Sequence, residues 1–317
     1  MTDATEPIAL DVLLLPAFAA DDFDFTKDLP DEFELWRESY EFEESVSIPG
    51  ANMPLYYTDD GIGITSTGMG KADAAATVTA ILASPKIDSS EAYFVTVGVA
   101  GSPPDVGTLG SVFLADDIVD WDRKHRWSER DGKQEEERGQ GKGKREKGKR
   151  EMPLELLSYR PYDYVYHLNG ELVADARRAG ESVELLDSPG TEAYRNRYSQ
   201  VAARKKPSVE VGTTLCGDEF WHGETVAEQA QWLVDRYDAG TYATTEMEEM
   251  GTATALDRFG LLDRYLSVRG VVNFDRPYEG QSIRESLDDG VQAETFDVTL
   301  ENVRRVGSAI VEELRDG

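Results

Sequence analysis

Apolar residues along this chain form short runs that alternate with longer segments of helical periodicity. A short apolar run bounded by Gly, Pro or polar positions predicts a buried strand, whereas apolar positions three or four apart predict an amphipathic helix. The strand-like segments are Ala9–Leu15, Gly61–Thr67, Ala92–Val97, Ser111–Val119, Val209–Leu215, Thr241–Met247 and Tyr265–Val272. The helix-like segments are Lys71–Leu82, Glu171–Leu186, Glu224–Tyr237, Glu249–Phe259 and Phe296–Leu314.

The strand-then-helix order repeats along the whole chain and predicts an α/β fold. Such an order gives a largely parallel or mixed sheet whose faces are covered by helices. No internal repeat divides the 317 residues, and the one unusual segment is a charged stretch at 123–150. We therefore expect a single domain over residues 1–317. No apolar run approaches the ~20 residues of a membrane-spanning helix, so no span is expected.

Charge is distributed unevenly along the chain. It holds 62 Asp and Glu against 33 Lys and Arg, a net charge of −29, yet residues 123–150 carry 12 Lys or Arg and 6 Asp or Glu. This stretch lacks apolar periodicity, and we expect it to be a disordered surface insertion. Elsewhere the chain is acidic and poor in Lys, a composition that favours a halophilic protein over an ordinary acidic one.

The same composition limits partners, location and metal sites. The negative electrostatic potential of so acidic a protein repels DNA, RNA and anionic membranes, so we expect no nucleic-acid partner. Residues 1–7 carry acids where a signal peptide carries Lys or Arg, which favours a cytoplasmic location. One cysteine and three histidines exclude a disulfide framework and a Cys-rich metal site, and no metal is expected.

Two glycine-rich segments follow predicted strands, where open α/β folds bind their ligands. Gly68-Met69-Gly70 precedes Lys71, and Gly98-Val99-Ala100-Gly101 follows Val97. Glycine lets a backbone approach a ligand closely, and a following helix offers free N–H groups to an anion. A plain tight turn is the alternative for both segments. Neither matches a dinucleotide or Walker fingerprint, so a nicotinamide-dependent enzyme remains only an alternative function.

Two further strand ends carry polar side chains. A carboxylate in Glu246-Met247-Glu248 could bind the two hydroxyls of a vicinal diol, although the acids could also simply favour the first turn of the next helix. Asn273 could recognise the edge of a heterocyclic base, because an amide both donates and accepts hydrogen bonds. A local Asp275–Arg276 pair in an Asn/Asp-Pro turn is the alternative there.

Together these segments resemble one family. The chain contains TSTGMGKADAAATVTAIL, FVTVGVAGSPPDVGTLGSVFLADDIVDWD, TTLCGDEFWHG, TTEMEEMGTATAL and VRGVVNFDRPYEGQS, in this order. They are similar to the purine nucleoside permease family, from about Leu13 to Leu287, and that family resembles the nucleoside phosphorylase and nucleosidase superfamily. The resemblance implies a three-layer α/β/α domain with a mixed, partly barrel-like sheet. It also implies cleavage of the N-glycosidic bond of purine nucleosides.

The resemblance assigns roles to residues of this chain. Glu248 and Met247 would bind the ribose, and Leu215, Cys216 and Phe220 would line the base pocket. Asn273 stands where most relatives with purine substrates carry an Asp that protonates the base. An amide cannot act as an acid but can hydrogen-bond a 6-oxopurine, so the resemblance implies inosine- or guanosine-like substrates.

The attacking group is left open between water and phosphate. Gly68, Lys71, Thr96 and Gly98 mark the positions of a nucleophile or phosphate site, but Thr96 replaces an expected Arg. A site without Arg binds phosphate poorly, and Asp21 aligns with the Glu that orients water in hydrolytic relatives. Hydrolysis is therefore slightly favoured over phosphorolysis, no cofactor is expected, and phosphate is a co-substrate only if the enzyme is a phosphorylase.

Four further points complete the expectations. The family name allows a nucleoside-binding component of an uptake system without catalysis. Relatives imply a homo-oligomer. His222 could act as a base, although a hydrogen-bonded or surface histidine is the simpler interpretation, and Cys216 could be a small packing residue instead of a nucleophile.

Overall fold

A ten-stranded mixed sheet forms the centre of the molecule. The computed structural model describes residues 6–19, 31–37, 39–127, 152–159, 164–289 and 291–316. Along the sheet the order is β11, β8, β12, β13, β7, β2, β5, β4 and β3, with β14 between β7 and β8. The strands are β2 (Val12–Leu15), β3 (Glu44–Val46), β4 (Leu55–Tyr57), β5 (Ile62–Ile64), β7 (Tyr93–Ser102), β8 (Val112–Asp120), β11 (Val165–His167), β12 (Val209–Cys216), β13 (Tyr242–Glu246) and β14 (Tyr265–Phe274). Two separate pairs join β1 (Ile8–Ala9) to β6 (Ile87–Asp88) and β9 (Lys124–Arg126) to β10 (Leu154–Leu156).

Part of this sheet closes on itself. Strand β14 runs parallel to β7 and antiparallel to β8, while β8, β12, β13 and β7 are successive neighbours. These five strands make a closed ring, which confirms the expected partly barrel-like sheet. The register of β14 against β7 shifts between Val271 and Asn273, and this places Asn273 opposite Gly101. The irregularity directs the end of β14 toward the end of β13, where Thr245 also pairs with Gly101.

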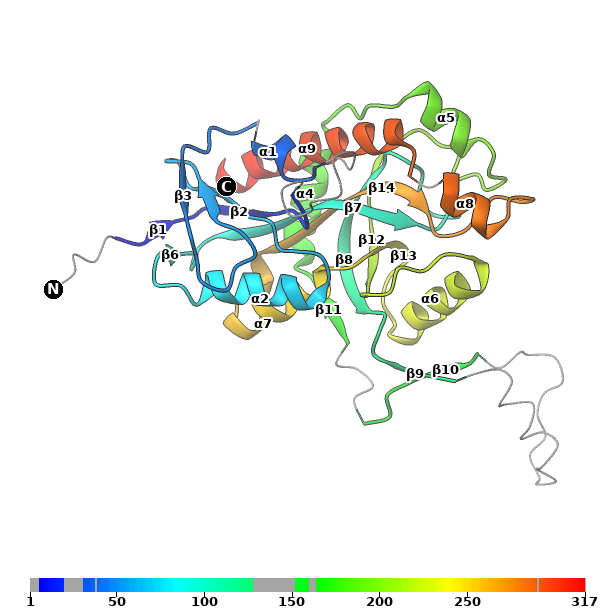
Figure 1. Cartoon of the computed structure of the whole chain (residues 1–317), viewed down its shortest axis with the longest axis horizontal. Coiled ribbons are helices and arrows are strands. Elements are labelled where there is room, and N and C mark those ends of the chain that lie inside the picture. The colour runs from blue at the N-terminus through cyan, green and yellow to red at the C-terminus, as the bar shows by residue number, and fades with distance from the viewer. Residues whose placement is uncertain are drawn as a thin grey trace.

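Helices cover both faces of the sheet, as expected for a three-layer α/β/α fold. On one side α2 (Lys71–Leu82) packs against α7 (Glu249–Phe259), and on the other α9 (Ala293–Asp316) packs against α4 (Gly170–Glu181) and the sheet (Figure 1). A Cβ atom on Gly251 of α7 would overlap the backbone of Lys71, so glycine permits this close approach. The other helices are α1 (Glu34–Arg37), α5 (Pro189–Arg195), α6 (Glu224–Arg236), α8 (Ile283–Asp289) and the 3₁₀ turn η2 (Leu262–Arg264).

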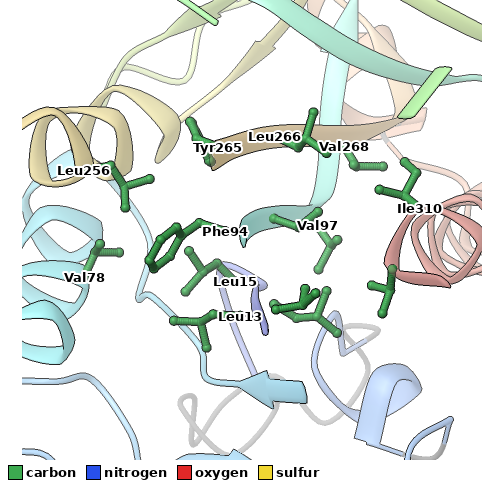
Figure 2. Packing of buried hydrophobic residues seen from close by; sticks show 14 of the residues in the cluster. Leu13, Leu15, Val78, Phe94, Val97, Leu256, Tyr265, Leu266, Val268 and Ile310 are labelled. Atoms are coloured by element: carbon green, nitrogen blue, oxygen red, sulfur yellow. The ribbon is translucent and has the colours of Figure 1, made fainter. Parts of the chain in front are cut away.

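The largest apolar core lies on the two faces of β2, β7 and β14. Phe94 of β7 is fully buried, with Val78 of α2 and Leu256 of α7 on one side of the strands (Figure 2). Ile310 of α9 lies on the other side, near Val97. Strands covered on both faces need apolar residues at successive positions, which explains why β2 is a continuous apolar run and why β7 and β14 are apolar at most of their positions.

Two local expectations are corrected by the structure. The turn expected at Gly98–Gly101 is strand, because β14 pairs with β7 as far as Ser102 and its ladder extends the strand through the glycines. The helix expected over 171–186 ends at Glu181, and α5 begins separately at Pro189. Of the stretch 123–150, Lys124–Arg126 forms β9, and residues 128–150 lie outside the described part.

Candidate active site

The loop from β13 to α7 forms the centre of the site. The Oε2 atom of Glu246 accepts hydrogen bonds from the N–H groups of Glu248 and Glu249, at 2.7 and 2.9 Å. These bonds satisfy amides in the first turn of α7, where a carboxylate also interacts well with the helix dipole. Glu248 is 4% exposed, and its Oε1 accepts from the N–H of Gly70 at 3.0 Å, at the start of α2. The loop is therefore anchored to both helices of this face.

Arg269 on β14 joins the acidic side chains of this loop. Its side chain is buried, and its Nε donates to Oε1 of Glu249 at 2.7 Å. Its Nη2 lies 3.3 Å from Oε2 of Glu246 and 3.2 Å from Oε2 of Glu248. Burial lowers the pKa of Arg269, but the surrounding carboxylates raise that pKa well above its usual value. A permanently charged guanidinium thus holds three glutamates in place.

Glu32 reaches the same cluster from a segment that the sequence analysis did not single out. Its Oε2 accepts from the N–H of Ala17 at 2.9 Å, just after β2, and its Oε1 accepts from the N–H of Val99 at 2.8 Å. Burial raises the pKa of Glu32 to about 7, although Arg269 opposes the shift. A buried carboxyl group that titrates near neutral pH has the properties of a general base.

Gly98 leaves open the space that both Glu32 and Arg269 enter. A Cβ atom on Gly98 would lie 2.8 Å from Nη1 of Arg269 and 2.8 Å from Oε1 of Glu32. Any larger residue would push these two side chains apart, because both lie where its Cβ atom would be. Gly98 therefore belongs to the site through the space that it leaves open.

The acidic cluster retains protons near neutral pH. Burial and the neighbouring Glu249 raise the pKa of Glu246 to about 8, while Arg269 lowers it. Among the described residues, Oε1 of Glu246 and Oε2 of Glu249 are buried without a hydrogen-bond partner. Four carboxyl groups surround one guanidinium, and like charges in close contact resist full ionisation.

Two adjoining cavities open beside this cluster. We call the smaller one, which contains Glu246, the acidic cavity, and its volume is about 40 Å³. We call the larger one, which contains Tyr194 and Tyr198, the aromatic cavity, and its volume is about 200 Å³. Phe220 and Asn273 line both of them. The acidic cavity is also lined by Gly101, Glu219, Trp221, Thr245, Glu246, Met247 and Asp275. The aromatic cavity is also lined by Tyr194, Tyr198, His222, Phe274, Ser286, Leu287 and Val291.

The residues expected at the base divide into two groups. Phe220 is 71% exposed and lines both cavities, and Asn273 lies between them with its Nδ2 donating to the carbonyl oxygen of Phe274 at 3.1 Å. Leu215 and Cys216 are fully buried under this surface and line neither cavity. Burial raises the pKa of the Cys216 thiol well above its usual value, which makes a poor nucleophile.

The residues expected at a phosphate site are engaged with other groups. The Nζ of Lys71 lies 2.9 Å from Asp120 and 2.6 Å from Asp122. The N–H of Lys71 donates to Asp218 at 2.8 Å, so a carboxylate of the chain occupies the start of α2. Thr96 is fully buried and hydrogen-bonds the hydroxyl of Tyr265. Gly68 has φ +81° in the turn before α2, and Asp21 lies outside the described residues.

Comparison with solved structures defines the class of fold. The 5′-methylthioadenosine/S-adenosylhomocysteine nucleosidase of Neisseria meningitidis, solved with methylthio-immucillin-A, has a TM-score of 0.58 at 16% identity and covers 96% of this chain and 99% of its own. The corresponding enzyme of Colwellia psychrerythraea, solved with adenine, has a TM-score of 0.59 at 15% identity, with 96% of each chain covered. Futalosine hydrolase of Helicobacter pylori has a TM-score of 0.55 at 15% identity, with 97% of each chain covered. This is the fold of nucleosidases.

The family follows from the sequence match. The model of the purine nucleoside permease (NUP) family matches residues 10–317, and the chain belongs to this family. A probable purine nucleoside permease of Schizosaccharomyces pombe is 28% identical over 221 residues, or 67% of this chain and 64% of that protein. A purine nucleoside permease of Candida albicans is 24% identical over 314 residues, or 89% of this chain and 72% of that protein. The match to the S. pombe relative thus spans less than two thirds of its length.

The described residues contain neither a membrane-spanning helix nor a metal-binding cluster. None of the helices in these segments has the length and apolar character needed to cross a membrane. Across the same part of the chain, His, Cys, Asp and Glu nowhere gather in a geometry that could hold a metal ion.

Proposed function

We propose that this chain hydrolyses the N-glycosidic bond of purine nucleosides. The observation that carries the proposal is the cluster in which Arg269 pairs with Glu248 in the anchored loop and interacts electrostatically with Glu32, a carboxyl group titrating near neutral pH. Nucleosidases with this fold include proteins solved with adenine or with an immucillin. Their likeness supports the class of reaction, and the residues of this chain support the roles that follow.

The two cavities offer separate surfaces for sugar and base. Glu246 and Met247 line the acidic cavity, so we assign the ribose to this side, with Glu248 behind it. The aromatic cavity is large enough for the flat rings of the base, which Phe220 can stack against. Asn273, at the junction, hydrogen-bonds the base and favours a 6-oxopurine, as the sequence predicts.

In the proposed step, Glu32 accepts a proton from a water molecule. The water oxygen forms a bond to C1′ of the ribose, and the bond from C1′ to N9 of the base breaks. The electron pair of that bond leaves with the base. Asn273 hydrogen-bonds the departing base, and the base then takes a proton from solvent. The carboxylate of Glu248 stabilises the positive charge that develops on the sugar.

Water is favoured over phosphate by the pairing of the nearby cations. Lys71 is held by two aspartates, Arg276 pairs with Asp275 at 2.7 Å, and Arg269 is surrounded by glutamates. Phosphate carries about two negative charges near neutral pH and would have to displace these carboxylates. A water molecule meets no such barrier.

A nucleoside-binding protein without catalysis is the second candidate, because the similar fungal proteins are named permeases.

One assay separates the candidates. The protein is incubated in molar KCl with inosine, guanosine, adenosine or uridine, with and without phosphate, and the products are resolved by chromatography. We expect free purine base and ribose in both buffers, with no cleavage of uridine.

Ribose 1-phosphate formed only when phosphate is present would overturn hydrolysis in favour of phosphorolysis. Binding without any cleavage, measured by calorimetry with the same nucleosides, would replace the enzyme with the binding protein.

A further inference from the structure

The aromatic cavity offers a base few polar groups besides Asn273. Tyr198 packs against Phe274 with ring centroids 4.3 Å apart, and its hydroxyl donates to the carbonyl oxygen of Arg276 at 3.0 Å. This tyrosine is therefore already committed to packing and to the backbone. Tyr194, which also lines the wall, is hydrogen-bonded to Tyr198. The other polar side chains on the wall are His222 and Ser286.

His222 and Ser286 form a hydrogen-bonded pair across two elements. The Nε2 of His222 lies 2.9 Å from Oγ of Ser286, which is on α8, while His222 belongs to the loop before α6. Among the described residues, no hydrogen bond is made to the second ring nitrogen, Nδ1. The pair thus leaves one nitrogen of a half-buried imidazole for a ligand.

The position of this pair is fixed by the neighbouring glycine. The N–H of Gly223 donates to the carbonyl oxygen of Asp275 at 2.8 Å, which ties the loop to the end of β14. A Cβ atom on Gly223 would lie 3.2 Å from Ile283, so α8 packs directly on this point. The contacts hold His222, Ser286 and Asn273 around the same cavity.

A bound nucleoside would place one particular part of its base here. If the ribose lies beside Glu246 and Met247, the glycosidic nitrogen is near the junction at Asn273. The six-membered ring of the purine then projects into the aromatic cavity, away from the sugar. Its outer edge, which carries the substituent at position 6, faces the wall formed by His222 and Ser286.

We propose that His222, positioned by Ser286, is a specificity-determining residue that hydrogen-bonds the substituent at position 6 of the purine. The inference rests on the function proposed above. Burial lowers the pKa of His222, so the imidazole is neutral at neutral pH, with one nitrogen donating and the other accepting. The hydroxyl of Ser286 can donate or accept, so the ring can adopt either tautomer. His222 can therefore bind a 6-oxo or a 6-amino group, while Asn273 sets the preference between them.

The test compares substrates with and without that substituent. His222→Phe keeps a flat ring of similar size but removes both nitrogens. We expect kcat/KM to fall about 10-fold for inosine and for adenosine, the loss expected for one neutral hydrogen bond. Purine riboside, which has only hydrogen at position 6, should be cleaved at the wild-type rate. Its turnover also shows that the variant is folded.

Two further variants complete the design. Ser286→Ala should lower activity on inosine and adenosine and spare purine riboside, because the imidazole loses its positioning partner. His125→Phe is the matched control, since His125 pairs with Glu155 on the β9–β10 hairpin and lines neither cavity. It should leave all three substrates unchanged.

The possible outcomes distinguish failure of the inference about His222 from failure of the proposed nucleoside hydrolysis. If the wild-type protein cleaves none of the three nucleosides, the proposed function fails. If the wild type cleaves them and His222→Phe slows purine riboside as much as inosine, or slows neither, the inference about His222 is wrong and the proposed function stands.

Discussion

Glu32 and Arg269 both reach the space beside Gly98 and interact electrostatically there, one from a segment near the N-terminus and the other from β14. Glu32 is fixed by two backbone N–H groups, and Arg269 is fixed by three glutamates of the loop before α7 and its first turn. Arg269 therefore lies between the proposed general base, Glu32, and the glutamates of the proposed ribose site. Most of the behaviour that we expect from this protein depends on that connection.

The dependence of activity on pH follows from Glu32. A general base works only without its proton, and burial raises the pKa of Glu32 to about 7. We expect kcat/KM for inosine to fall about tenfold for each pH unit below that value and to level off above it. Initial rates measured across this range give the profile. A flat profile through pH 7 would show that Glu32 is not the base.

The stability of the fold should also depend on pH, through Glu246. Its pKa is raised to about 8 in the folded protein, from 4.5 for the unperturbed group. Between these values the folded chain binds a proton that the unfolded chain has released, so the free energy of unfolding falls as pH rises. Above about pH 8 this contribution levels off.

Denaturation of Glu246→Gln by urea, at pH values across that window, measures the effect. The amide oxygen of Gln can still accept the two N–H groups at the start of α7, so the change chiefly removes the titration. We expect a shallower fall in stability with pH than in the wild type. Glu228→Gln, which removes one charge from an exposed position on α6, controls for net charge. Equal slopes in all three proteins would contradict the assignment.

The fold was largely predictable from the sequence, because its strands are buried on both faces. Val12–Leu15 is apolar at every position, and Tyr265–Val272 is apolar apart from Ser267, Arg269 and Gly270; the structure extends the second run only to Phe274. The error at Gly98–Gly101 has a physical cause, since glycine usually interrupts strands. Here glycine lies within a strand because buried side chains need the space that a Cβ atom would fill.

Gly98→Ala tests this account of the glycine. The new methyl group would overlap both Glu32 and Arg269, and we expect a loss of about 1–3 kcal/mol in the free energy of unfolding. Displacement of the Glu32 carboxyl group should also lower kcat for inosine. Gly170→Ala is the control, because nothing lies within 4 Å of the added atom and alanine favours the helix. A fully active and stable Gly98→Ala protein would show that the space is not required.

The site was only partly predictable. Met247, Glu248 and Phe220 follow strands and Asn273 lies at the end of β14, and the expectation that strand ends converge is enough to find such residues. Glu32 comes from a segment rich in acids, where nothing distinguishes one carboxylate from its neighbours. The apolar residue that follows it, Phe33, was the signal available in the sequence, and the structure buries this residue.

Arg269 was missed for a different reason. It lies inside an apolar strand, where a lone charged residue must be paired to be buried. An arginine in such a position indicates a buried acidic partner, and Glu246, Glu248 and Glu249 supply it. This argument could have been made from the sequence, although the partners could not have been identified without the closed part of the sheet.

The choice between purines should depend on Asn273. Asn273→Asp keeps the shape of the side chain but lets a carboxyl group donate a proton to the base, and its ionised form can only accept, as it would from a 6-amino group. We expect the ratio of kcat/KM for inosine to that for adenosine to fall about 10-fold or more, the usual scale of one such contact. Competition between the two nucleosides, followed by chromatography, measures the ratio directly. An unchanged ratio would remove Asn273 from base selection.

The most direct test of the account is the rate at which Glu32→Gln releases purine base from inosine in phosphate-free buffer. If water attacks with help from this carboxylate, kcat should fall by about 10²–10⁴, the usual contribution of a general base. Glu34→Gln, two residues away and half exposed beside Arg37, should match the wild type. An unchanged kcat in Glu32→Gln would contradict the account. So would a wild-type protein that cleaves inosine only when phosphate is added.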